Sequence, residues 1–310
     1  MKILLTSTSF MDTPGSHHDL LKTIDAEIDT MRGPVNEAAL LPVIAQYDAV
    51  VCGDDEYTRK VLETGKAGRL RILSKYGIGL DKIDLKAAEE LGIKVANTPG
   101  VNHVTVAEHA FTHILAFFKN YYEEVTYVRE GKWKRLIQHE IYGKRLSIFG
   151  LGRIGKELAI RAKAFGLGVK VYDPFADKAF VAEHGLTLCE NLDDLFNEAE
   201  IISLHSPLTE DTKHVMNAER FAKLNCSPLV VNTARAGLVD KEALIMALDN
   251  KQICGYVADV MWEEPIQPEE PLLKHANVFI TPHIGSRTYE SVVRQGSAAV
   301  NNLISLINKQ

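Results

Sequence analysis

A glycine-rich turn between a strand and a helix constrains the fold of this chain more than any other feature of its sequence. The turn reads Gly150-Leu151-Gly152-Arg153-Ile154-Gly155, and it follows an apolar run over residues 146–149. A helix-like stretch over residues 156–165 and a second strand over residues 169–172 come next. A strand, a glycine turn, a helix and a strand within about 30 residues are typical of a parallel α/β unit that binds a dinucleotide.

The three glycines have separate physical tasks in such a unit. Gly150 permits the tight turn, Gly152 lets the backbone approach a pyrophosphate, and Gly155 lets the helix pack closely on the strand. The first turn of the helix then presents backbone N–H groups and the positive end of its dipole to the phosphates. The turn therefore predicts a nucleotide cofactor.

An acidic residue at the end of the second strand indicates which nucleotide is bound. Asp173 follows that strand, about 20 residues after the glycine turn. Its carboxylate can accept hydrogen bonds from a ribose hydroxyl and would repel a 2′-phosphate. The next residues, Pro174-Phe175-Ala176, carry no positive charge that would attract such a phosphate. The sequence therefore favours NAD over NADP.

The composition is that of a globular protein with room for two domains. The chain has 310 residues, of which 46% are hydrophobic and 25% charged, and its formal net charge is −6. It has no lysine- or arginine-rich stripe, which argues against nucleic acid as the main partner. The N-terminal segment is predicted as a first strand rather than a signal peptide, and no apolar stretch is long enough to span a bilayer. The four cysteines lie far apart without a CxxC motif, so neither a disulfide framework nor a zinc site is expected, and a cytoplasmic location is the default.

Short apolar strands alternate with helix-like segments along the chain, which predicts parallel α/β sheets. The chain contains two such series of alternating strands and helices, and the glycine turn lies at the start of the second. We therefore predict an α/β protein with two doubly wound parallel-sheet domains, in which a Rossmann-type nucleotide domain is inserted into a flavodoxin-like substrate domain. Besides the glycine unit, the predicted strands are 3–6, 49–52, 71–74, 94–96, 201–204, 229–232, 256–260 and 278–281, and the predicted helices include 36–46, 85–91 and 288–308.

The chain is predicted to cross between the two domains twice. The segment Asn97-Thr98-Pro99-Gly100 breaks the pattern of strands and helices and has the composition of a hinge. The last helical stretch can return to the first domain near residue 286. The predicted domains are residues 1–98 with 286–310 for the substrate domain, and residues 99–285 for the nucleotide domain.

A long helical stretch is predicted over residues 104–129. It is apolar on more than one face between Phe111 and Phe118, and such a helix is usually buried. We expect burial between domains or between subunits, and a homodimer formed through this region is the simplest explanation.

Three polar residues follow separate late strands of the nucleotide domain, where ligands bind in open parallel sheets. Arg235 follows the strand at 229–232, Glu264 comes after the strand at 256–260, and His283 follows the strand at 278–281. Arginine can hold a carboxylate through two parallel hydrogen bonds, histidine can exchange a proton near neutral pH, and a carboxylate paired with histidine favours its charged form. Taken singly, each is more often a surface or loop residue, so spacing alone leaves the catalytic role open.

Sequence segments spread over about two thirds of the chain match the motifs of one known protein family, in the same order. They are Lys75-Tyr76-Gly77-Ile78-Gly79-Leu80-Asp81-Lys82-Ile83-Asp84; Asn97-Thr98-Pro99-Gly100 with Val106-Ala107-Glu108-His109; the glycine turn; His205-Ser206-Pro207-Leu208-Thr209; Asn232-Thr233-Ala234-Arg235; Asp259 with Glu264-Pro265; and Thr281-Pro282-His283-Ile284-Gly285. In this order they resemble the D-isomer-specific 2-hydroxyacid dehydrogenase family, most closely its phosphoglycerate dehydrogenase-like branch.

The resemblance implies an NAD-dependent oxidoreductase that acts on the CH–OH group of a 2-hydroxy acid or on the matching 2-keto acid. It makes His283 the acid or base, Glu264 its partner, and Arg235 the residue that binds the substrate carboxylate. It also implies that the turn at Gly77 offers backbone N–H groups to that carboxylate and that Asp259 contacts the nicotinamide carboxamide. The residues expected around the cofactor are Gly150, Gly152, Arg153, Ile154, Gly155, Asp173, His205, Pro207, Thr212, Thr233, Ala234, Arg235, Asp259, His283 and Ser286, and those around the substrate are Lys75, Gly77, Ile78, Gly79, Arg235 and His283.

Two positions depart from the family pattern. Ala236 stands where the family often has glycine, and it would strain the turn if that position needs a positive φ. Ser286 stands where the family often has the second glycine of a pair, and its hydroxyl can add a hydrogen bond near the nicotinamide or the substrate. We expect neither change to abolish activity.

Several residues keep a second interpretation. Lys75 can bind a substrate phosphate, as in 3-phosphohydroxypyruvate, or it can face solvent. His109 and His113 are expected on a packed helix face, and no metal site is predicted. His205 is expected to line the cofactor cleft, whereas His17-His18 has the sequence of a solvated loop.

Other functions fit the same residues. A non-catalytic NAD-sensing scaffold of the co-repressor type shares the fold and the three polar residues, and phosphite dehydrogenase also has a lysine before the turn. Formate dehydrogenase differs because it has Gln at the position of Glu264. The identity of the 2-hydroxy or 2-keto acid, and whether it is phosphorylated, stays open on these grounds.

Overall fold

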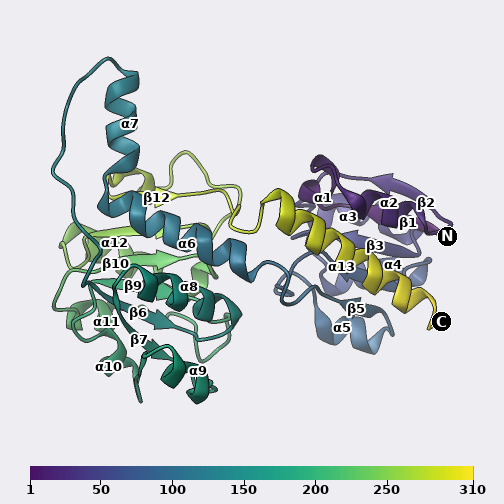
Figure 1. Cartoon of the computed structure of the whole chain (residues 1–310). Helices are drawn as coiled ribbons and strands as arrows, with labels where there is room; N and C mark the ends of the chain where they lie inside the picture. The colour runs from purple at the N-terminus through teal and green to yellow at the C-terminus, as the bar shows by residue number, and fades with distance from the viewer. Residues whose placement is uncertain (310) are drawn as a thin grey trace. The chain divides into compact units, whose positions relative to one another are not determined.

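Two parallel sheets organise the chain, one in each of its two compact units. The computed structural model describes residues 1–309 (Figure 1). Unit 1 comprises residues 1–102 and 286–310, of which Gln310 lies outside the described residues, and unit 2 comprises residues 103–285. The predicted domains change at residues 98 and 286, whereas the structure places the first change after Asn102, where helix α6 begins.

Unit 2 contains the glycine turn and a seven-stranded parallel sheet within residues 103–285. The order of its strands is β12-β11-β10-β9-β6-β7-β8, so the chain reverses direction across the sheet between β6 and β9. Such a reversal is where doubly wound sheets bind dinucleotides. The strands are β6 (Arg145–Phe149), β7 (Gly168–Tyr172), β8 (Thr187–Leu188), β9 (Ile201–Leu204), β10 (Leu229–Asn232), β11 (Gly255–Ala258) and β12 (Val278–Ile280).

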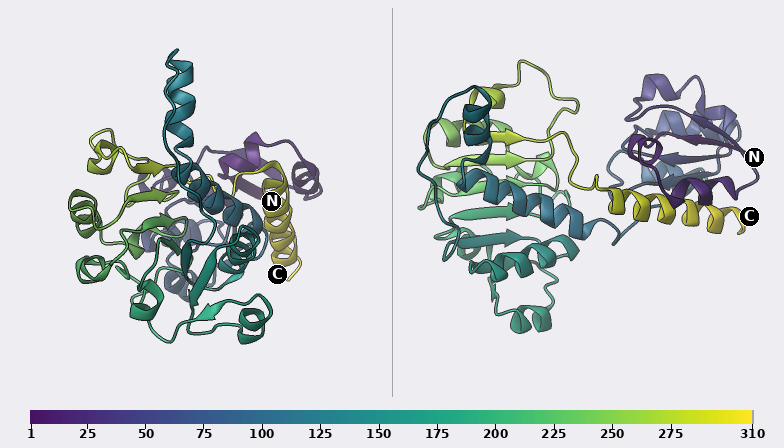
Figure 2. Two further views of the ribbon diagram at one scale, coloured as in Figure 1. Left: turned by 60° about the vertical axis from the view of Figure 1, so that its left-hand side comes forward. Right: turned by 45° about the horizontal axis from the view of Figure 1, so that its top comes forward.

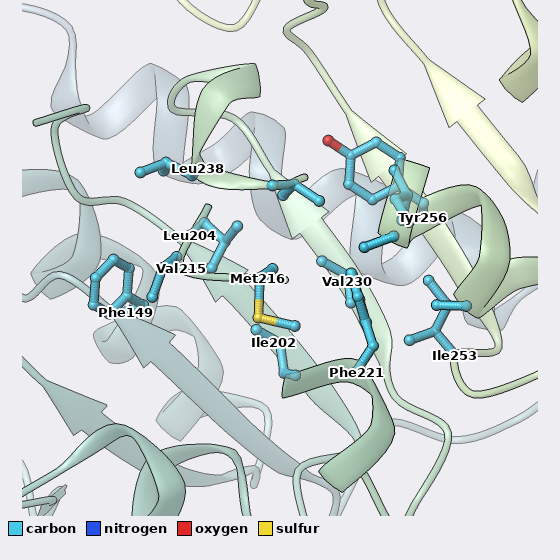
Figure 3. Close-up of a cluster of buried hydrophobic side chains, with 14 of the residues drawn as sticks. Phe149, Ile202, Leu204, Val215, Met216, Phe221, Val230, Leu238, Ile253 and Tyr256 are labelled. Carbon is cyan, nitrogen blue, oxygen red and sulfur yellow. The ribbon is translucent and has the colours of Figure 1, made fainter. Parts of the chain in front are cut away.

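Both faces of this sheet are covered, and neighbouring residues of one strand therefore enter different cores. In β9, Ile202 belongs to the apolar cluster shown in Figure 3, whereas Ile201 packs into the cluster under α6 and α8. Each fully buried branched side chain of this kind contributes about 1.5–3 kcal/mol. The helices of unit 2 are α6 (His103–Phe118), α7 (Tyr121–Arg129), α8 (Arg153–Ala164), α9 (Lys178–Glu183), α10 (Leu192–Phe196), α11 (Ala218–Lys223) and α12 (Lys241–Asp249), with the 3₁₀ helices η2 (Ala236–Leu238) and η3 (Pro271–Lys274).

Unit 1 contains a five-stranded parallel sheet with the order β2-β1-β3-β4-β5, which is the flavodoxin-like order. The C-terminal helix α13 (Tyr289–Ile307) returns to this unit and lies along its sheet (Figures 1 and 2). Its buried face, which includes Val292, Ala299 and Leu303, packs on residues of β1, β3 and β4. The other elements are β1 (Lys2–Leu5), β2 (Glu27–Thr30), β3 (Ala49–Cys52), β4 (Ile72–Lys75), β5 (Lys94–Ala96), α1 (Thr8–Asp12), α2 (Ser16–Lys22), α3 (Glu37–Leu40), η1 (Ile44–Gln46), α4 (Arg59–Ala67) and α5 (Leu85–Glu90).

Three local predictions were wrong. The stretch 104–129 is two helices, because Asn120 adopts a left-handed backbone (φ 46°) between α6 and α7. The stretch 36–46 is likewise divided, into α3 and η1. His17 is fully buried in α2, where its Nε2 lies 3.1 Å from the carbonyl oxygen of Phe10, so His17-His18 is not a solvated loop.

The apolar face of α6 is buried within its own unit. Ala107, Ala110, Phe111 and Ile114 belong to the core cluster that covers one face of the unit 2 sheet. Burial of α6 therefore does not by itself require a second subunit. By contrast, none of the residues Tyr121–Arg129 that form α7 is buried, and α7 stands away from the sheet of unit 2 (Figures 1 and 2).

Candidate active site

The glycine turn has the close approaches that only glycine allows. Gly150 has a φ of +97°, and a Cβ atom there would lie 2.7 Å from the backbone nitrogen of Ser206. A Cβ atom on Gly155 would collide with the carbonyl oxygen of Gly150. Gly152 caps α8 and faces open space, with no atom within 4 Å of a Cβ placed there. The turn therefore leaves the N-terminus of α8 accessible to a pyrophosphate.

Asp173 supports this turn from the end of β7. Its Oδ2 accepts a hydrogen bond from the Leu151 N–H (2.8 Å), and its Oδ1 accepts one from the Phe175 N–H (2.8 Å). A carboxylate has about four lone-pair sites, so acceptor capacity remains for a ribose hydroxyl. A hollow of about 630 Å³ lies beside Asp173, and Phe175 and Glu190 are among the residues that line it. These features fit the adenosine half of NAD.

Two buried polar atoms near the strand ends also fit a bound cofactor. Within residues 1–309, neither Thr233 Oγ1 nor His205 Nδ1 has a hydrogen-bond partner. His205 lies just after β9, and its Nε2 is 2.8 Å from the hydroxyl of Ser203. Burial lowers the pKa of His205 to about 4, so the ring is neutral near pH 7. Buried polar atoms without partners are uncommon, and a ligand can supply the missing bonds.

Arg235 lies three residues beyond β10, in a turn that is fixed by Asn232. The Asn232 side-chain amide donates to the Arg235 carbonyl (2.9 Å), and its oxygen accepts from the Ala234 N–H (3.1 Å). The Arg235 guanidinium donates through one nitrogen to the Ala234 carbonyl (2.7 Å). Ala236 begins the 3₁₀ helix η2 and is not in the left-handed region, so the strain considered for alanine at this position does not arise.

His283 and Glu264 form a direct pair. The Nδ1 atom of His283 lies 2.8 Å from Oε2 of Glu264, and the side chains are 38% and 37% exposed. The other carboxylate oxygen of Glu264 accepts the Met261 N–H (2.9 Å), which fixes the carboxylate against the loop after β11. A carboxylate at Nδ1 favours a proton on that nitrogen and stabilises the imidazolium, which leaves Nε2 as the nitrogen that can exchange a proton.

The backbone around His283 is held by Asp259. His283 has a φ of +53°, in the left-handed region. Asp259 is 3% exposed; its oxygens accept the Ile284 N–H (2.9 Å) and the Gly285 N–H (2.7 Å), directly after His283. Burial alone raises the pKa of Asp259, but hydrogen bonds from His109, Thr281 and Ile284 outweigh burial and hold the pKa below its usual value. Asp259 is thus an ionised anchor for the loop.

The substrate residues expected in unit 1 lie at the end of β4 and in the tightly bonded turn that follows it. Lys75 is 4% exposed, and its Nζ donates to Oδ1 of Asp54 at 2.6 Å, so the alternative in which Lys75 faces solvent is wrong. Gly77 has a φ of +118°, and its N–H donates to the Thr98 hydroxyl (2.9 Å). The Asn97 side chain donates to the Ile78 carbonyl (2.8 Å). These bonds fix the turn and occupy the N–H of Gly77.

The expected residues Pro207 and Thr212 lie on the loop that follows β9 in unit 2. Thr212 donates through its hydroxyl to the Pro207 carbonyl (2.7 Å), which closes the loop after β9. Arg153 and Ile154 form the first turn of α8, and Ser286 is the first residue of unit 1 after the crossing. Asn232 and Thr281 were not predicted as supporting residues, because local sequence does not report their hydrogen bonds to the Arg235 backbone and to the Asp259 carboxylate.

Unit 2 thus combines a dinucleotide-binding sheet with a histidine–carboxylate pair beyond two of its strands, which defines a nucleotide-dependent oxidoreductase class. Residues 111–285 match the sequence model of the NAD binding domain of D-isomer specific 2-hydroxyacid dehydrogenases. The chain belongs to the D-isomer specific 2-hydroxyacid dehydrogenase family, and the cofactor of this domain family is NAD.

Three relatives support this membership, two of which match this chain over most of their own length and one over about half of it. The chain is similar to glyoxylate reductase of Korarchaeum cryptofilum, with 38% identity over 88% of this chain and 83% of the relative. It is 38% identical to hydroxypyruvate reductase of Thermotoga maritima, over 89% of this chain and 90% of the relative. D-3-phosphoglycerate dehydrogenase of Synechocystis is 37% identical over 89% of this chain, but the match spans only 49% of that relative.

Solved structures share the architecture of the whole chain. The TT0316 protein from Thermus thermophilus has a TM-score of 0.89 and 32% identity, and the match covers 100% of this chain and 98% of that one. D-lactate dehydrogenase from Escherichia coli has a TM-score of 0.88 and 27% identity, again covering 100% and 98%. Two parallel-sheet α/β domains, as predicted from the sequence, are confirmed. No helix within residues 1–309 has both the length and the apolar character needed to cross a membrane.

Proposed function

We propose that the protein is an NAD-dependent D-2-hydroxyacid dehydrogenase that interconverts a 2-keto acid and a 2-hydroxy acid. The observation that carries the proposal is the 2.8 Å contact between His283 Nδ1 and Glu264 Oε2, beyond β12 and β11 of an NAD-binding domain. Imidazole paired with a carboxylate is suited to proton exchange with a carbonyl or alcohol oxygen near neutral pH. NAD supplies or accepts the hydride when it is bound.

His283 acts as acid in the reducing direction. Its Nε2 donates a proton to the substrate oxygen as that oxygen gains negative charge, and Glu264 stabilises the charged ring that precedes this transfer. The hydrogen bond from the Met261 N–H keeps the carboxylate from turning away from the ring. In the oxidising direction, the neutral His283 removes the hydroxyl proton. Both directions need the proton on Nδ1, which the Glu264 contact provides.

Arg235 binds the substrate carboxylate with two parallel hydrogen bonds and draws electron density from the neighbouring carbonyl. For unit 1, we propose that the N–H groups of Ile78 and Gly79 contribute to carboxylate binding, because the N–H of Gly77 is donated to Thr98.

The substrate is, in this proposal, a short 2-keto acid without a phosphate. The sequence singled out Lys75 as a cation next to the turn that is proposed to bind the substrate carboxylate. Lys75 is buried and paired with Asp54. A phosphate would have to compete with this carboxylate for the ammonium group. Glyoxylate and hydroxypyruvate, named for two of the relatives, are therefore the first substrates to test.

The experiment is NADH oxidation, followed by absorbance, across glyoxylate, hydroxypyruvate, pyruvate and 3-phosphohydroxypyruvate, with NADPH as a second reductant. We expect turnover with NADH and an unphosphorylated keto acid. Tight NADH binding without turnover of any keto acid would favour the NAD-sensing scaffold. Reduction of NAD by phosphite, with no keto acid reduced, would favour phosphite dehydrogenase. Preference for the phosphorylated substrate would refute our interpretation of Lys75.

We also propose that the protein is a homodimer through α7 and the segment that follows it. Large apolar side chains are exposed there, and such a patch is typical of an interface. Tyr121 is 60% exposed, Trp133 84%, Ile137 92% and Tyr142 77%. Sedimentation equilibrium should give the dimer mass for the parent and the monomer mass for Ile137→Glu. Met246→Glu, at an exposed position on α12, is the control that should stay dimeric.

A cytoplasmic location is proposed from the cysteines. All four are free thiols: Cys52 and Cys189 are buried, and Cys226 and Cys254 are exposed. Exposed free thiols suit a reducing compartment. Fractionation of cells that express the tagged protein would test this location, and recovery in an oxidising compartment would refute it.

A further inference from the structure

A pair of histidines lies behind the loop that carries His283, in unit 2. His109 and His113 are one turn apart in α6, and their Nε2 atoms are 3.0 Å apart. The two Nε2 atoms lie 3.0 and 3.2 Å from the hydroxyl oxygen of Thr281. Within residues 1–309, no group of three His, Cys, Asp or Glu side chains is placed to hold a metal ion. The pair is therefore a hydrogen-bonded cluster of the protein itself.

The cluster is connected to the catalytic loop through a buried carboxylate. The Thr281 hydroxyl donates to Oδ1 of Asp259 (2.6 Å), and His109 Nε2 lies 3.3 Å from the same oxygen. Asp259 in turn accepts the backbone N–H groups of Ile284 and Gly285. Bonds to this one carboxylate thus come from residues on both sides of His283.

Proton counting selects one arrangement of the pair. Only one proton can lie between two ring nitrogens that are 3.0 Å apart, so one imidazole must donate and the other must accept. If His113 donated, the lone pair of His109 Nε2 would face the ionised Asp259 at 3.3 Å, which is repulsive. If His109 donates, its N–H is shared among His113, Thr281 and Asp259. His113 is then the acceptor, and its own proton lies on Nδ1, which is buried and has no hydrogen-bond partner within residues 1–309.

The burial of His113 suits it to this role. Its side chain is 1% exposed. Burial, and next the charge of His109, lower the pKa of His113 to about 4, whereas Asp259 raises it, so the ring is neutral and keeps a lone pair at pH 7. The partner that a ring nitrogen finds determines which tautomer is present. An acceptor fixed at this point keeps the proton of His109 on Nε2, where it faces Asp259.

We propose that His113 is a positioning residue for the reaction: by accepting a hydrogen bond from His109, it fixes the tautomer that supports Asp259 and thereby holds the loop of His283. The expected effect on kcat rests on the proposed function, whereas the expected tautomer of His109 does not. Neither histidine acts directly on the substrate or the reacting atoms. Their effect passes through Asp259 and the backbone on both sides of His283.

The test compares two substitutions at one buried position. His113→Leu removes the acceptor and keeps an apolar side chain, whereas His113→Gln retains an acceptor oxygen near the position of Nε2. We expect kcat to fall about 10- to 100-fold in His113→Leu with little change in NADH affinity, and to recover at least partly in His113→Gln, because small displacements of a catalytic group have costs of this size. The pH profile of kcat should shift in His113→Leu alone.

A spectroscopic measurement tests the inference without turnover. Long-range ¹H–¹⁵N spectra of the imidazoles, recorded on the intact protein without NADH, should show His109 protonated at Nε2 in the parent and in His113→Gln. In His113→Leu the two tautomers of His109 should mix. If no keto acid is reduced by the parent, the proposed function fails but this measurement still decides the positioning role.

His17→Leu is the matched control. His17 is also a fully buried histidine, with one ring nitrogen near the Phe10 carbonyl oxygen and the other without a partner within residues 1–309, and burial lowers its pKa as well. Its loss should lower the melting temperature while the pH profile and the His109 signals stay those of the parent. Parent-like kinetics and His109 signals in His113→Leu would overturn the proposal, as would equal losses in His113→Leu and His113→Gln.

Discussion

Replacing Glu264 by Gln tests the proposed pairing most directly, because the substitution removes a charge and changes little in shape. The carboxylate accepts bonds from both His283 Nδ1 and the Met261 N–H. An amide has one oxygen and one NH₂ group, so it can satisfy only one of these donors. If the oxygen faces Met261, the NH₂ group faces Nδ1 and selects the wrong tautomer of His283. If the oxygen faces His283, two donors meet at Met261.

The magnitude follows from the loss of one charge-assisted hydrogen bond, which contributes about 1.5–3 kcal/mol. Both side chains are more than one-third exposed, at 38% and 37%, so solvent weakens the interaction and the lower part of this range applies. A loss of about 1.5–2 kcal/mol corresponds to about a 10- to 30-fold lower kcat/KM for keto-acid reduction.

The pH profile supplies the second readout. Reduction needs the charged His283, so its rate falls as the pH rises and the ring loses its proton. Without the Glu264 carboxylate the charged ring is less stable, and this fall should begin at lower pH in Glu264→Gln. Initial rates of NADH oxidation from about pH 5 to 9 would measure both effects. Glu263→Gln, the adjacent acidic residue on the exposed surface, is the matched control and should leave both unchanged. A parent-like rate and profile in Glu264→Gln would refute the assignment.

The remaining predictions concern the other site residues and the acid stability of the fold. His283→Ala should lower kcat by about 10²–10⁴-fold with NADH affinity nearly intact in a fluorescence titration, and a parent-like rate would exclude the acid–base role. Arg235→Lys should mainly raise KM for the keto acid, because ammonium cannot form two parallel bonds; unchanged kinetics would remove Arg235 from the site. Asp173→Ala should weaken NADH binding about 10-fold and reduce discrimination against NADPH, since the carboxylate holds the Leu151 N–H and would repel a 2′-phosphate. Unfolding by urea should become easier as the pH falls from 6.5 toward 4, because folding lowers the pKa of His113 and His205 from the ordinary value of 6.5 to about 4. In that window these two imidazoles bind protons in the unfolded chain but not in the folded one, and a constant urea midpoint would contradict these shifts.

The architecture was largely predictable from local sequence. Apolar runs such as Ala49–Cys52 and Leu229–Asn232 are strands buried on both faces, and their length and flanking residues indicate this without tertiary information. The glycine turn was equally predictable, because tight turns and close backbone approaches exclude other residues. The strands β2 and β8 were missed, since Glu27–Thr30 has only one apolar residue, Ile28, and β8 has only two residues, so neither carries a period-2 apolar signal.

The break at Asn120 and the burial of His17 depended on packing that no local pattern reports. Residues 111–118 and 121–129 both favour helix, and only the left-handed backbone at Asn120 separates them. His17 lies against α13, where a Cβ on Gly296 would come within 2.8 Å of its ring, so its burial comes from a residue far along the chain. Polar side chains are expected at the surface unless such a distant contact covers them.

The sequence by itself determined the two-domain α/β class, the dinucleotide turn and the choice of NAD, because these depend on residue type and spacing within one strand–turn–helix unit. Only the tertiary structure decided that Glu264 reaches His283, that Asp54 pairs with Lys75, and that the Asp259 carboxylate lies against His109 and the backbone next to His283. Each of these contacts joins residues from different elements of the fold. Hydrogen bonds act over about 3 Å, and sequence separation does not determine which side chains come that close.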